Sequence, residues 1–129
     1  MKVVGKMQFK IVHNNLNVSN LGKSLAFYDK ALGLKEARRI TGDGFIIVYL
    51  SAGIGGHLLE LTELAAHPQK YDLGENEFHL AFETDDFDGA FQLHKEMDYV
   101  CYENHGMGLY FISDPDGYWL EVVPEKQEG

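Results

Sequence analysis

The chain has 129 residues, 45% of them hydrophobic, and its 11 Lys and Arg against 20 Asp and Glu give a formal net charge of -9. This length and composition suit a single domain with a packed core. The acidic excess argues against partners that carry dense negative charge, which are nucleic acids and anionic membranes.

Three features of the sequence predict a cytoplasmic protein. Cys101 is the only cysteine, so no internal disulfide can form, as is usual in a reducing compartment. The first ten residues carry lysines at positions 2, 6 and 10 and lack the apolar stretch of a signal peptide. The longest apolar run, residues 45–50, is too short to span a bilayer.

The first half of the sequence predicts one strand, one helix and three further strands. Residues 10–18 alternate between two faces, as a strand does. A helix is predicted next because Ser19 or Asn20 can cap its start, apolar residues recur at helical spacing, and Gly33 can end it. Three more strands, separated by glycine-containing turns, are predicted at about 35–41, 45–50 and 57–63.

The second half predicts the same order of elements. Residues 77–84 alternate, and Asp85 or Asp86 can cap a helix with an apolar stripe. Strands follow near 100–103, 108–113 and 118–123, separated by turns with Gly and Pro. The sequence therefore predicts an α+β fold, a single domain of residues 1–129 in which two βαβββ modules, about 8–64 and 77–124, are joined by a linker at about 65–76.

Each half places a histidine on its first predicted strand and a glutamate on its last. These are His13 and Glu60, then His79 and Glu121. Both glutamates stand between apolar residues, where an unpaired carboxylate costs several kcal/mol. A divalent metal gives both a common partner, because two imidazoles and two carboxylates form a ligand set suited to Ni²⁺, Co²⁺ or Zn²⁺.

The alternative for each of these residues taken singly is structural. A glutamate in a strand usually faces solvent, and a histidine near the start of a strand usually has a packing role. The repetition of both residue types in equivalent segments favours the metal site.

Other polar and aromatic residues receive weaker assignments. Asn15 and Asn17 share the predicted face of His13 and are candidates for substrate binding. His57 precedes Glu60 on one predicted strand and is kept as a reserve ligand. Surface, loop or core positions are expected for the remaining histidines, His67, His94 and His105, and core or cavity-wall positions for Met107, Tyr110 and Trp119.

Four segments within residues 11–124 resemble one known family. HNNLNVSNLGKSLAFYDKALGLK resembles the opening strand and helix of glyoxalase I, and LELTE resembles the strand with the first glutamate ligand. KYDLGENEFHLAFETDDFDGA resembles the linker, second histidine strand and second helix. ISDPDGYWLEVV resembles the closing turn and strand, and DPDGYWLE within it is the most specific piece. The chain thus resembles the vicinal oxygen chelate superfamily and its compact bacterial glyoxalase I (lactoylglutathione lyase) branch.

The resemblance implies a fold, a ligand set and an assembly. The fold is the glyoxalase/bleomycin resistance/dioxygenase fold, whose curved sheets form an open cavity. The implied ligands of Ni²⁺ or Co²⁺, or else Zn²⁺, are His13, Glu60, His79 and Glu121. Glu121 matches the catalytic base, and Glu60 matches a ligand that can serve the other face of the substrate. The implied assembly is a homodimer in which each site takes one His–Glu pair from each chain.

The implied reaction is a lyase-class step of methylglyoxal detoxification. The hemithioacetal of a 2-oxoaldehyde such as methylglyoxal is isomerised to a 2-hydroxyacyl thioester, while the metal stabilises an enediolate. Members that use glutathione carry an Arg four residues after the first histidine, where this chain has Asn17. They carry an Asn four residues after the first glutamate, where this chain has Leu64. Because a bidentate clamp on a carboxylate is missing, the identity of the thiol is left open.

Other functions on the same scaffold also remain open. Methylmalonyl-CoA epimerase abstracts a proton beside a thioester with nearly the same ligands, so the ligands do not separate it from glyoxalase I. Fosfomycin-modifying transferases and extradiol dioxygenases use three ligands, which counts against them. Proteins of this fold that only bind small molecules usually lack the ligands, whereas all four are present here.

Overall fold

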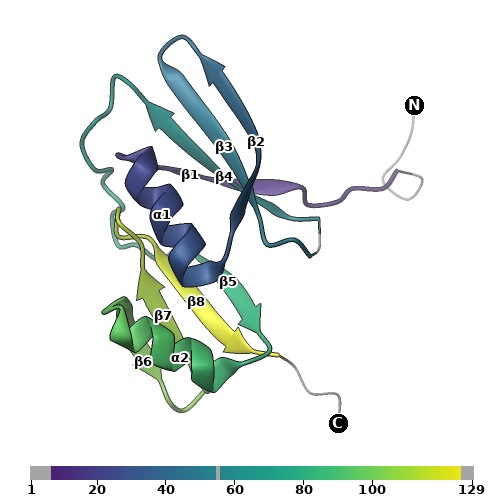
Figure 1. The fold of residues 1–129 in the computed structure, drawn as a ribbon, viewed down its shortest axis with the longest axis vertical. Helices are drawn as coiled ribbons and strands as arrows, with labels where there is room; N and C mark the ends of the chain where they lie inside the picture. Colours follow the sequence, from purple (N-terminus) through teal and green to yellow (C-terminus); the bar gives the residue numbers. More distant parts are fainter. Residues whose placement is uncertain (1–6, 55, 126–129) are drawn as a thin grey trace.

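The structure is a computed structural model that describes residues 7–54 and 56–125. Residues 1–6 of the segment inspected for a signal peptide, Gly55 of the turn before residue 57, and residues 126–129 of the predicted domain lie outside the described residues. Figure 1 shows two open sheets, each accompanied by one helix and arranged along the long axis of the molecule. The predicted α+β fold of paired βαβββ modules is confirmed.

The first module forms a sheet in which its first strand pairs with its last strand. Its strand order is β1-β4-β3-β2, with β1 parallel to β4 and the other pairs antiparallel. The strand that carries the histidine therefore lies beside the strand that carries the glutamate. The elements are β1 (His13–Asn17), α1 (Leu21–Leu32), β2 (Lys35–Gly42), β3 (Phe45–Ser51) and β4 (Leu58–Leu64).

The second module repeats this topology. Its strand order is β5-β8-β7-β6, with β5 parallel to β8. Repetition of the order places the second histidine strand beside the second glutamate strand. The elements are β5 (His79–Thr84), α2 (Phe87–Glu96), β6 (Val100–Asn104), β7 (Leu109–Ser113) and β8 (Trp119–Pro124).

The helices begin at two of the capping residues that the sequence offers. Asn20 has an extended backbone, and its side chain accepts a hydrogen bond from the Lys23 N–H at 3.1 Å. Asp86 accepts in the same way from the Gly89 N–H at 3.1 Å. Gly33 ends α1 with a φ of 68°, a left-handed conformation that glycine adopts without strain.

Both modules contribute to one hydrophobic core, which sets the direction of the two glutamates. Neighbouring residues of a strand point to opposite faces of its sheet. Because the neighbours of Glu60 and Glu121 are buried in the core, the two carboxylates face away from it. The core residues are Leu16, Val18, Leu21, Phe27, Tyr28, Ala31, Leu34, Val48, Leu50, Leu59, Leu61, Tyr110, Ile112, Leu120 and Val122.

Buried hydrogen bonds tie the first helix to the second module. The Tyr28 hydroxyl donates to the Asp114 carboxylate at 2.7 Å, and both side chains are buried. His94, which is 2% exposed, contacts the Ala31 carbonyl through Nε2 at 2.7 Å and the Tyr110 hydroxyl through Nδ1 at 2.8 Å. The buried polar groups of Tyr28, Asp114 and His94 therefore all have partners, as burial favours, whereas the buried Ser24 hydroxyl of α1 has none within the described part of the chain.

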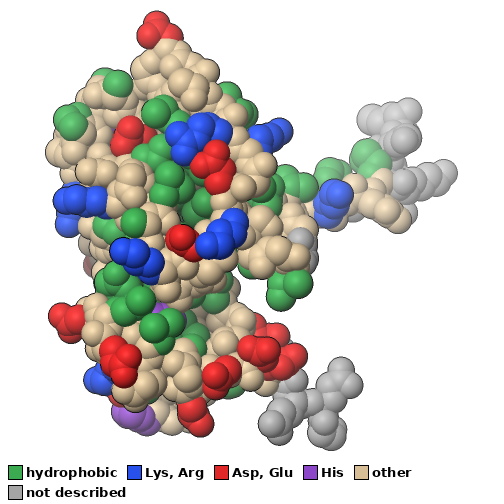
Figure 2. Space-filling model, in the orientation of Figure 1, with side chains coloured by type: hydrophobic (Ala, Val, Ile, Leu, Met, Phe, Trp, Pro, Cys, Tyr) green, Lys and Arg blue, Asp and Glu red, His purple; other side chains and the backbone are tan. Residues whose placement is uncertain are grey.

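Charge is divided unequally between the modules. Residues 8–64 hold six Lys and Arg against five Asp and Glu, whereas residues 77–124 hold only Lys95 against eleven Asp and Glu. In the view of Figure 2, Lys and Arg side chains lie mostly over the first module, and acidic side chains predominate over the second. Among the residues described, no helix has the length and apolar character needed to cross a membrane.

Candidate functional site

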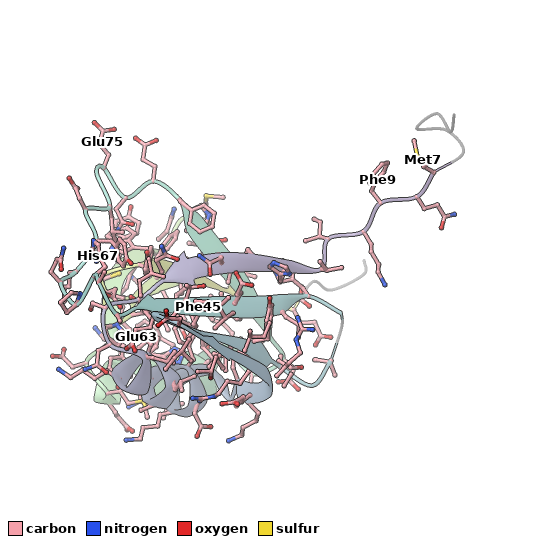
Figure 3. All side chains as sticks on the ribbon, turned by 90° about the horizontal axis from the view of Figure 1, so that it is seen from above. Met7, Phe9, Phe45, Glu63, His67 and Glu75 are labelled. Carbon is pink, nitrogen blue, oxygen red and sulfur yellow. The ribbon has the colours of Figure 1, made fainter. Side chains whose placement is uncertain are left out.

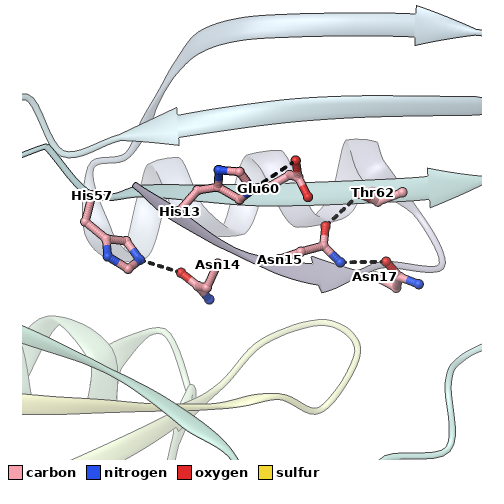
Figure 4. A network of polar contacts seen from close by, with 7 residues as sticks. All are labelled: His13, Asn14, Asn15, Asn17, His57, Glu60 and Thr62. Carbon is pink, nitrogen blue, oxygen red and sulfur yellow. Dashed lines mark hydrogen bonds and ion pairs between the residues drawn. The ribbon is translucent and has the colours of Figure 1, made fainter. Parts of the chain in front are cut away.

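The first predicted pair meets on the outer face of the first sheet. β1 and β4 run parallel in a register that sets Asn15 beside Glu60, so His13 and Glu60 lie on one face. Nε2 of His13 is 3.7 Å from the Glu60 carboxylate (Figure 4). The His13 side chain is 39% exposed and that of Glu60 is 14% exposed, so the pair opens to solvent at the imidazole.

Tyr49 on β3 completes this cluster from the other side of Glu60. It is the antiparallel partner of Glu60, is 6% exposed, and meets the His13 ring edge-on at 5.4 Å between centroids. A hydrogen bond to the Glu60 carboxylate, together with burial, raises the pKa of the Tyr49 hydroxyl. The Arg38 guanidinium lies 4.4 Å from the centre of the Tyr49 ring. We call His13, Glu60, Tyr49 and Asn15 the first half-site.

The predicted substrate-binding asparagines lie beside this pair. Figure 4 shows the Thr62 hydroxyl donating to Asn15 Oδ1 at 2.6 Å and Asn15 Nδ2 donating to Asn17 at 2.8 Å. With its amide turned over, Asn15 donates to the Glu60 carboxylate at 2.9 Å and to Thr62 Oγ1 at 2.6 Å. The turned orientation is favoured because it places a donor, rather than a second acceptor, against the carboxylate.

The second predicted pair has the same frame but different neighbours. Nε2 of His79 is 4.0 Å from the Glu121 carboxylate, and the side chains are 45% and 19% exposed. Phe111 pairs with Glu121 and meets the His79 ring edge-on at 5.4 Å, as Tyr49 meets His13. Ala81 is the parallel partner of Glu121 on β5. We call His79, Glu121, Phe111 and Ala81 the second half-site.

An aromatic cavity adjoins the second half-site. Its volume is about 430 Å³, and its lining combines four ring side chains with three polar residues: His79, Tyr102, Phe111 and Trp119, then Glu75, Asn76 and Glu77. The Tyr102 ring stacks on Trp119 at 6.1 Å between centroids. A cavity of this size and lining accepts a small organic molecule with an apolar part.

The two half-sites do not come together within one chain. No group of three or more His, Cys, Asp or Glu side chains that could hold a metal ion occurs in residues 7–54 and 56–125. The reason lies in the shared core, which occupies the inner faces of both sheets and leaves the two glutamates on outer faces. One chain therefore presents two separate donor pairs.

Each pair fits a divalent metal as half of a ligand set. Bonds of about 2.1 Å place two ligands of one ion at most about 4.2 Å apart. The separations of 3.7 Å at His13–Glu60 and 4.0 Å at His79–Glu121 lie within that limit. An imidazole and a carboxylate are donors that Ni²⁺, Co²⁺ and Zn²⁺ accept. Four ligands require both pairs.

The reserve ligand, His57, lies apart from Glu60. It precedes β4, is three residues from Glu60 and contacts Asn14 Oδ1 through Nε2 at 2.7 Å (Figure 4). Asn14 alternates with His13 and Asn15 on β1 and so belongs to the opposite face of the sheet. His13 is consequently the histidine that accompanies Glu60 on the outer face.

The remaining candidates have places away from the pairs. His67 stacks on Tyr71 in the linker at 3.7 Å between centroids and is labelled in Figure 3. His105 is exposed and lies 3.3 Å from Glu103. Met107 is 74% exposed and Tyr110 belongs to the core, so Trp119 alone of the three cavity candidates lines the aromatic cavity.

The DPDG turn has a structural role beside the second half-site. Asp114 accepts hydrogen bonds from the N–H groups of Asp116 and Tyr118, both at 2.9 Å, and burial raises its pKa. Asp116 accepts from the Ser19 hydroxyl at 2.6 Å. These bonds fix the start of β8 and tie it to the first module, which positions Glu121 two residues later.

Sequence reasoning missed the residues that flank the two glutamates. Tyr49, Phe111 and Tyr102 were either unassigned or counted only within strands. Alternation along residues 45–51 does place Tyr49 with Phe45 and Ile47 on one face, but which glutamate that face meets depends on the strand register.

The comparisons with known proteins agree on one family. The sequence-family model of the Glyoxalase/Bleomycin resistance protein/Dioxygenase superfamily matches residues 10–122 of this chain. A lactoylglutathione lyase of Neisseria meningitidis is 33% identical over 127 residues, which cover 91% of each protein. A lactoylglutathione lyase of Escherichia coli O157:H7 is 28% identical, with coverage of 93% of this chain and 96% of that one.

Two solved structures illustrate the range of proteins with this fold. The trypanothione-dependent glyoxalase I of Leishmania major has a TM-score of 0.82 at 27% identity and covers 92% of this chain and 88% of its own. An antibiotic-binding protein from Streptomyces sp. CB03234 has a TM-score of 0.70 at 19% identity, with 92% of this chain and 98% of its own covered. The second likeness is one of fold alone.

Proposed function

The chain belongs to the Glyoxalase/Bleomycin resistance protein/Dioxygenase superfamily, and on that premise we propose a metal-dependent, lactoylglutathione lyase-like isomerase. Its reaction converts the hemithioacetal of methylglyoxal, or of a similar 2-oxoaldehyde, to a 2-hydroxyacyl thioester. The observation that carries the proposal is the pair of repeat-related His–Glu half-sites, both facing out of the core. The relatives named lactoylglutathione lyase support an enzyme over a binding protein.

The proposed ligands are the four residues of the two pairs. His13 and His79 offer Nε2, and Glu60 and Glu121 offer carboxylate oxygens. A bound divalent metal supplies Lewis-acid stabilisation of the negative charge that develops on the substrate oxygens. Ni²⁺ and Co²⁺ are the preferred candidates and Zn²⁺ the alternative, since nitrogen and oxygen donors suit all three.

A second copy of the chain is the proposed partner, because each copy holds only half of the ligand set at each place. Two symmetric sites arise when the first half-site of one chain meets the second half-site of the other. Charge supports this pairing, since contact between two second modules would bring together two sets of eleven acidic residues, which repel each other.

The segment before β1, which carries Met7 and Phe9, projects from the body in Figure 3, and Phe9 and Ile11 are each 77% exposed.

The residues of the second half-site are suited to move the proton. Glu121 is proposed as the base that takes the proton from C1 and returns it to C2. Phe111 and Trp119 wall the adjoining cavity and exclude water from one side of the reacting carbons. Glu60 is proposed to stay a ligand and to serve the other face of the substrate.

The thiol portion of the substrate is open to more than glutathione. Asn17 stands where glutathione-using members carry an Arg, and a neutral amide gives a carboxylate a weaker grip than a guanidinium. Asn15 and Asn17 remain the proposed contacts to the substrate. The Leishmania major neighbour depends on trypanothione, so a different thiol is compatible with this scaffold.

The proposed location is the cytoplasm, where methylglyoxal removal would take place. Cys101 is a free, exposed thiol, which a reducing compartment preserves.

The direct test combines metal content with an isomerase assay. Protein stripped with a chelator should bind about one Ni²⁺ or Co²⁺ per chain and then turn over the adduct of methylglyoxal with glutathione or another thiol. A metal-binding protein that is inert with every thiol but epimerises a 2-acyl-CoA would move the function to the epimerase class. A protein that binds no metal, and whose His13→Ala variant is unchanged in every assay, would contradict the proposal.

A further inference from the structure

Glu60 has a hydrogen-bond donor on each neighbouring strand. Asn15 is its register partner on β1, and its amide lies 2.9 Å from the carboxylate. Tyr49 is its register partner on β3, and the neighbouring Glu60 carboxylate is the largest cause of the raised pKa of the Tyr49 hydroxyl. Arg38 lies over the Tyr49 ring, 4.4 Å from its centroid. Because the Glu60 carboxylate can only accept, the Tyr49 hydroxyl is the group that can donate between these two side chains.

Glu121 has register partners at the same two positions, but neither partner can donate a hydrogen bond to it. Its register partner on β5 is Ala81, and its register partner on β7 is Phe111. Neither side chain has a donor. The frame is nevertheless matched, since Phe111 meets its histidine at 5.4 Å and 84°, and Tyr49 meets its own at 5.4 Å and 79°. The difference between the half-sites at this position is therefore one hydroxyl group on an equally placed ring.

We propose that Tyr49 is a positioning residue that holds Glu60 mainly as a metal ligand, and that the lack of a hydroxyl at Phe111 leaves Glu121 free to act as the main base. The inference rests on the proposed function and assigns unequal roles to the two carboxylates from their own surroundings. A carboxylate that accepts two hydrogen bonds is restrained in position, and its ligand geometry is thereby fixed. A base must instead rotate between the metal and the substrate carbon, which restraint would oppose.

The test uses two reciprocal variants that each change one oxygen atom. Tyr49→Phe gives the first half-site the ring of the second, and Phe111→Tyr gives the second half-site the ring of the first. Both keep the ring that packs on the histidine, so the fold is preserved. Affinity for Ni²⁺, the visible spectrum of the Co²⁺-loaded protein, kcat and KM are measured for each, with far-UV circular dichroism as a check of folding.

The two variants should fail in different ways. Tyr49→Phe should weaken Ni²⁺ binding by about 10- to 100-fold, the usual effect of removing an outer partner of a ligand, and should alter the Co²⁺ spectrum. Phe111→Tyr should bind Ni²⁺ at least as tightly as the parent and lower kcat by about tenfold with KM unchanged, because one hydrogen bond now restrains Glu121.

A third variant extends the comparison to the other donor. Asn15→Ala copies Ala81 and should weaken Ni²⁺ binding further when combined with Tyr49→Phe. If all variants bind Ni²⁺ within about twofold of an active parent and keep its kcat, the inference is wrong and the proposed function stands. If the parent itself binds no Ni²⁺ and is inactive with every substrate, the proposed function fails and the inference fails with it.

Discussion

The two half-sites share a frame and differ in what surrounds it. In both, a histidine on the first strand lies near a glutamate on the last strand and meets an aromatic ring edge-on. The first half-site surrounds its carboxylate with polar groups and an arginine, whereas the second adjoins a cavity walled by aromatic rings. The repeated βαβββ module thus presents the same His–Glu donor pair twice. The residues beside each glutamate on the neighbouring strands differ, so the two pairs have different chemical surroundings.

The difference between the half-sites indicates that the flanking residues, rather than the donor pairs, distinguish the two glutamates. The donor pairs alone would predict interchangeable carboxylates, because His13–Glu60 and His79–Glu121 have similar separations of 3.7 Å and 4.0 Å. In the proposed account, the flanking residues assign metal binding mainly to Glu60 and proton transfer mainly to Glu121. The variants below test that division, in order of decreasing effect.

The sharpest contrast is between the two glutamate-to-glutamine variants. Glu121→Gln should retain most metal binding and lose about 10²- to 10⁴-fold in kcat, the range for loss of a general base. Glu60→Gln should instead lose metal, by more than the about 10- to 100-fold that an outer partner costs. Metal titration and steady-state kinetics on both variants measure the contrast. Equal losses in the two variants would erase the division of roles.

The next effect concerns the thiol portion of the substrate and Asn17, which lies beside the first half-site. Asn17→Arg restores a charge-assisted clamp worth about 1.5–3 kcal/mol, which corresponds to a decrease of about 10- to 100-fold in KM for the glutathione adduct. The matched control is Asn17→Gln, which adds length without charge and should leave KM nearly unchanged. A glutathione adduct with equal KM in parent and Asn17→Arg would show that the carboxylate does not reach this position.

The smallest effect concerns the joint between the modules. Tyr28→Phe leaves one oxygen of the buried Asp114 without its donor and should lower the free energy of unfolding by about 1–3 kcal/mol. Tyr71→Phe is the matched control, since the Tyr71 hydroxyl is buried without a partner and its removal should cost little. Urea denaturation of both variants measures the difference, and equal stabilities would contradict the role given to the Tyr28 bond.

The pH dependence of that loss has a definite sign. Burial raises the pKa of Asp114, and the hydrogen bond from Tyr28 opposes that rise by favouring the carboxylate. Removing the donor raises the folded-state pKa further, so the loss in Tyr28→Phe should be largest at neutral pH, where Asp114 is ionised. The loss should shrink as pH falls and the carboxyl is protonated in both the folded and the unfolded protein.

Much of the fold could be predicted because local patterns determine it. Alternation, capping residues and turn glycines located all ten elements, although the first strand starts at His13 rather than at residue 10. The pairing ends at the bond from the Leu58 N–H to the Val12 carbonyl, because β4 begins only at Leu58 and offers no partner to residues 10 and 11. The boundary was therefore set by the length of the neighbouring strand, which local alternation does not reveal.

The site was less predictable because it depends on register and on packing between modules. The sequence located both His–Glu pairs, but Tyr49 reaches Glu60 only through the pairing of β3 with β4. No local pattern in the sequence shows that the shared core turns the two pairs away from each other, and only the resemblance to a dimeric family implied it. These are tertiary properties, fixed by contacts between residues distant in the chain.

The central claim is that two chains complete each site, and subunit complementation tests it most directly. His13→Ala and His79→Ala chains, each with a different affinity tag, are coexpressed, and the mixed dimer is purified through both tags. One of its sites then combines both substitutions, while the other combines an intact first half-site with an intact second half-site. The account predicts two inactive homodimers and a mixed dimer with about half the activity of the parent. A mixed dimer as inactive as the homodimers would contradict it.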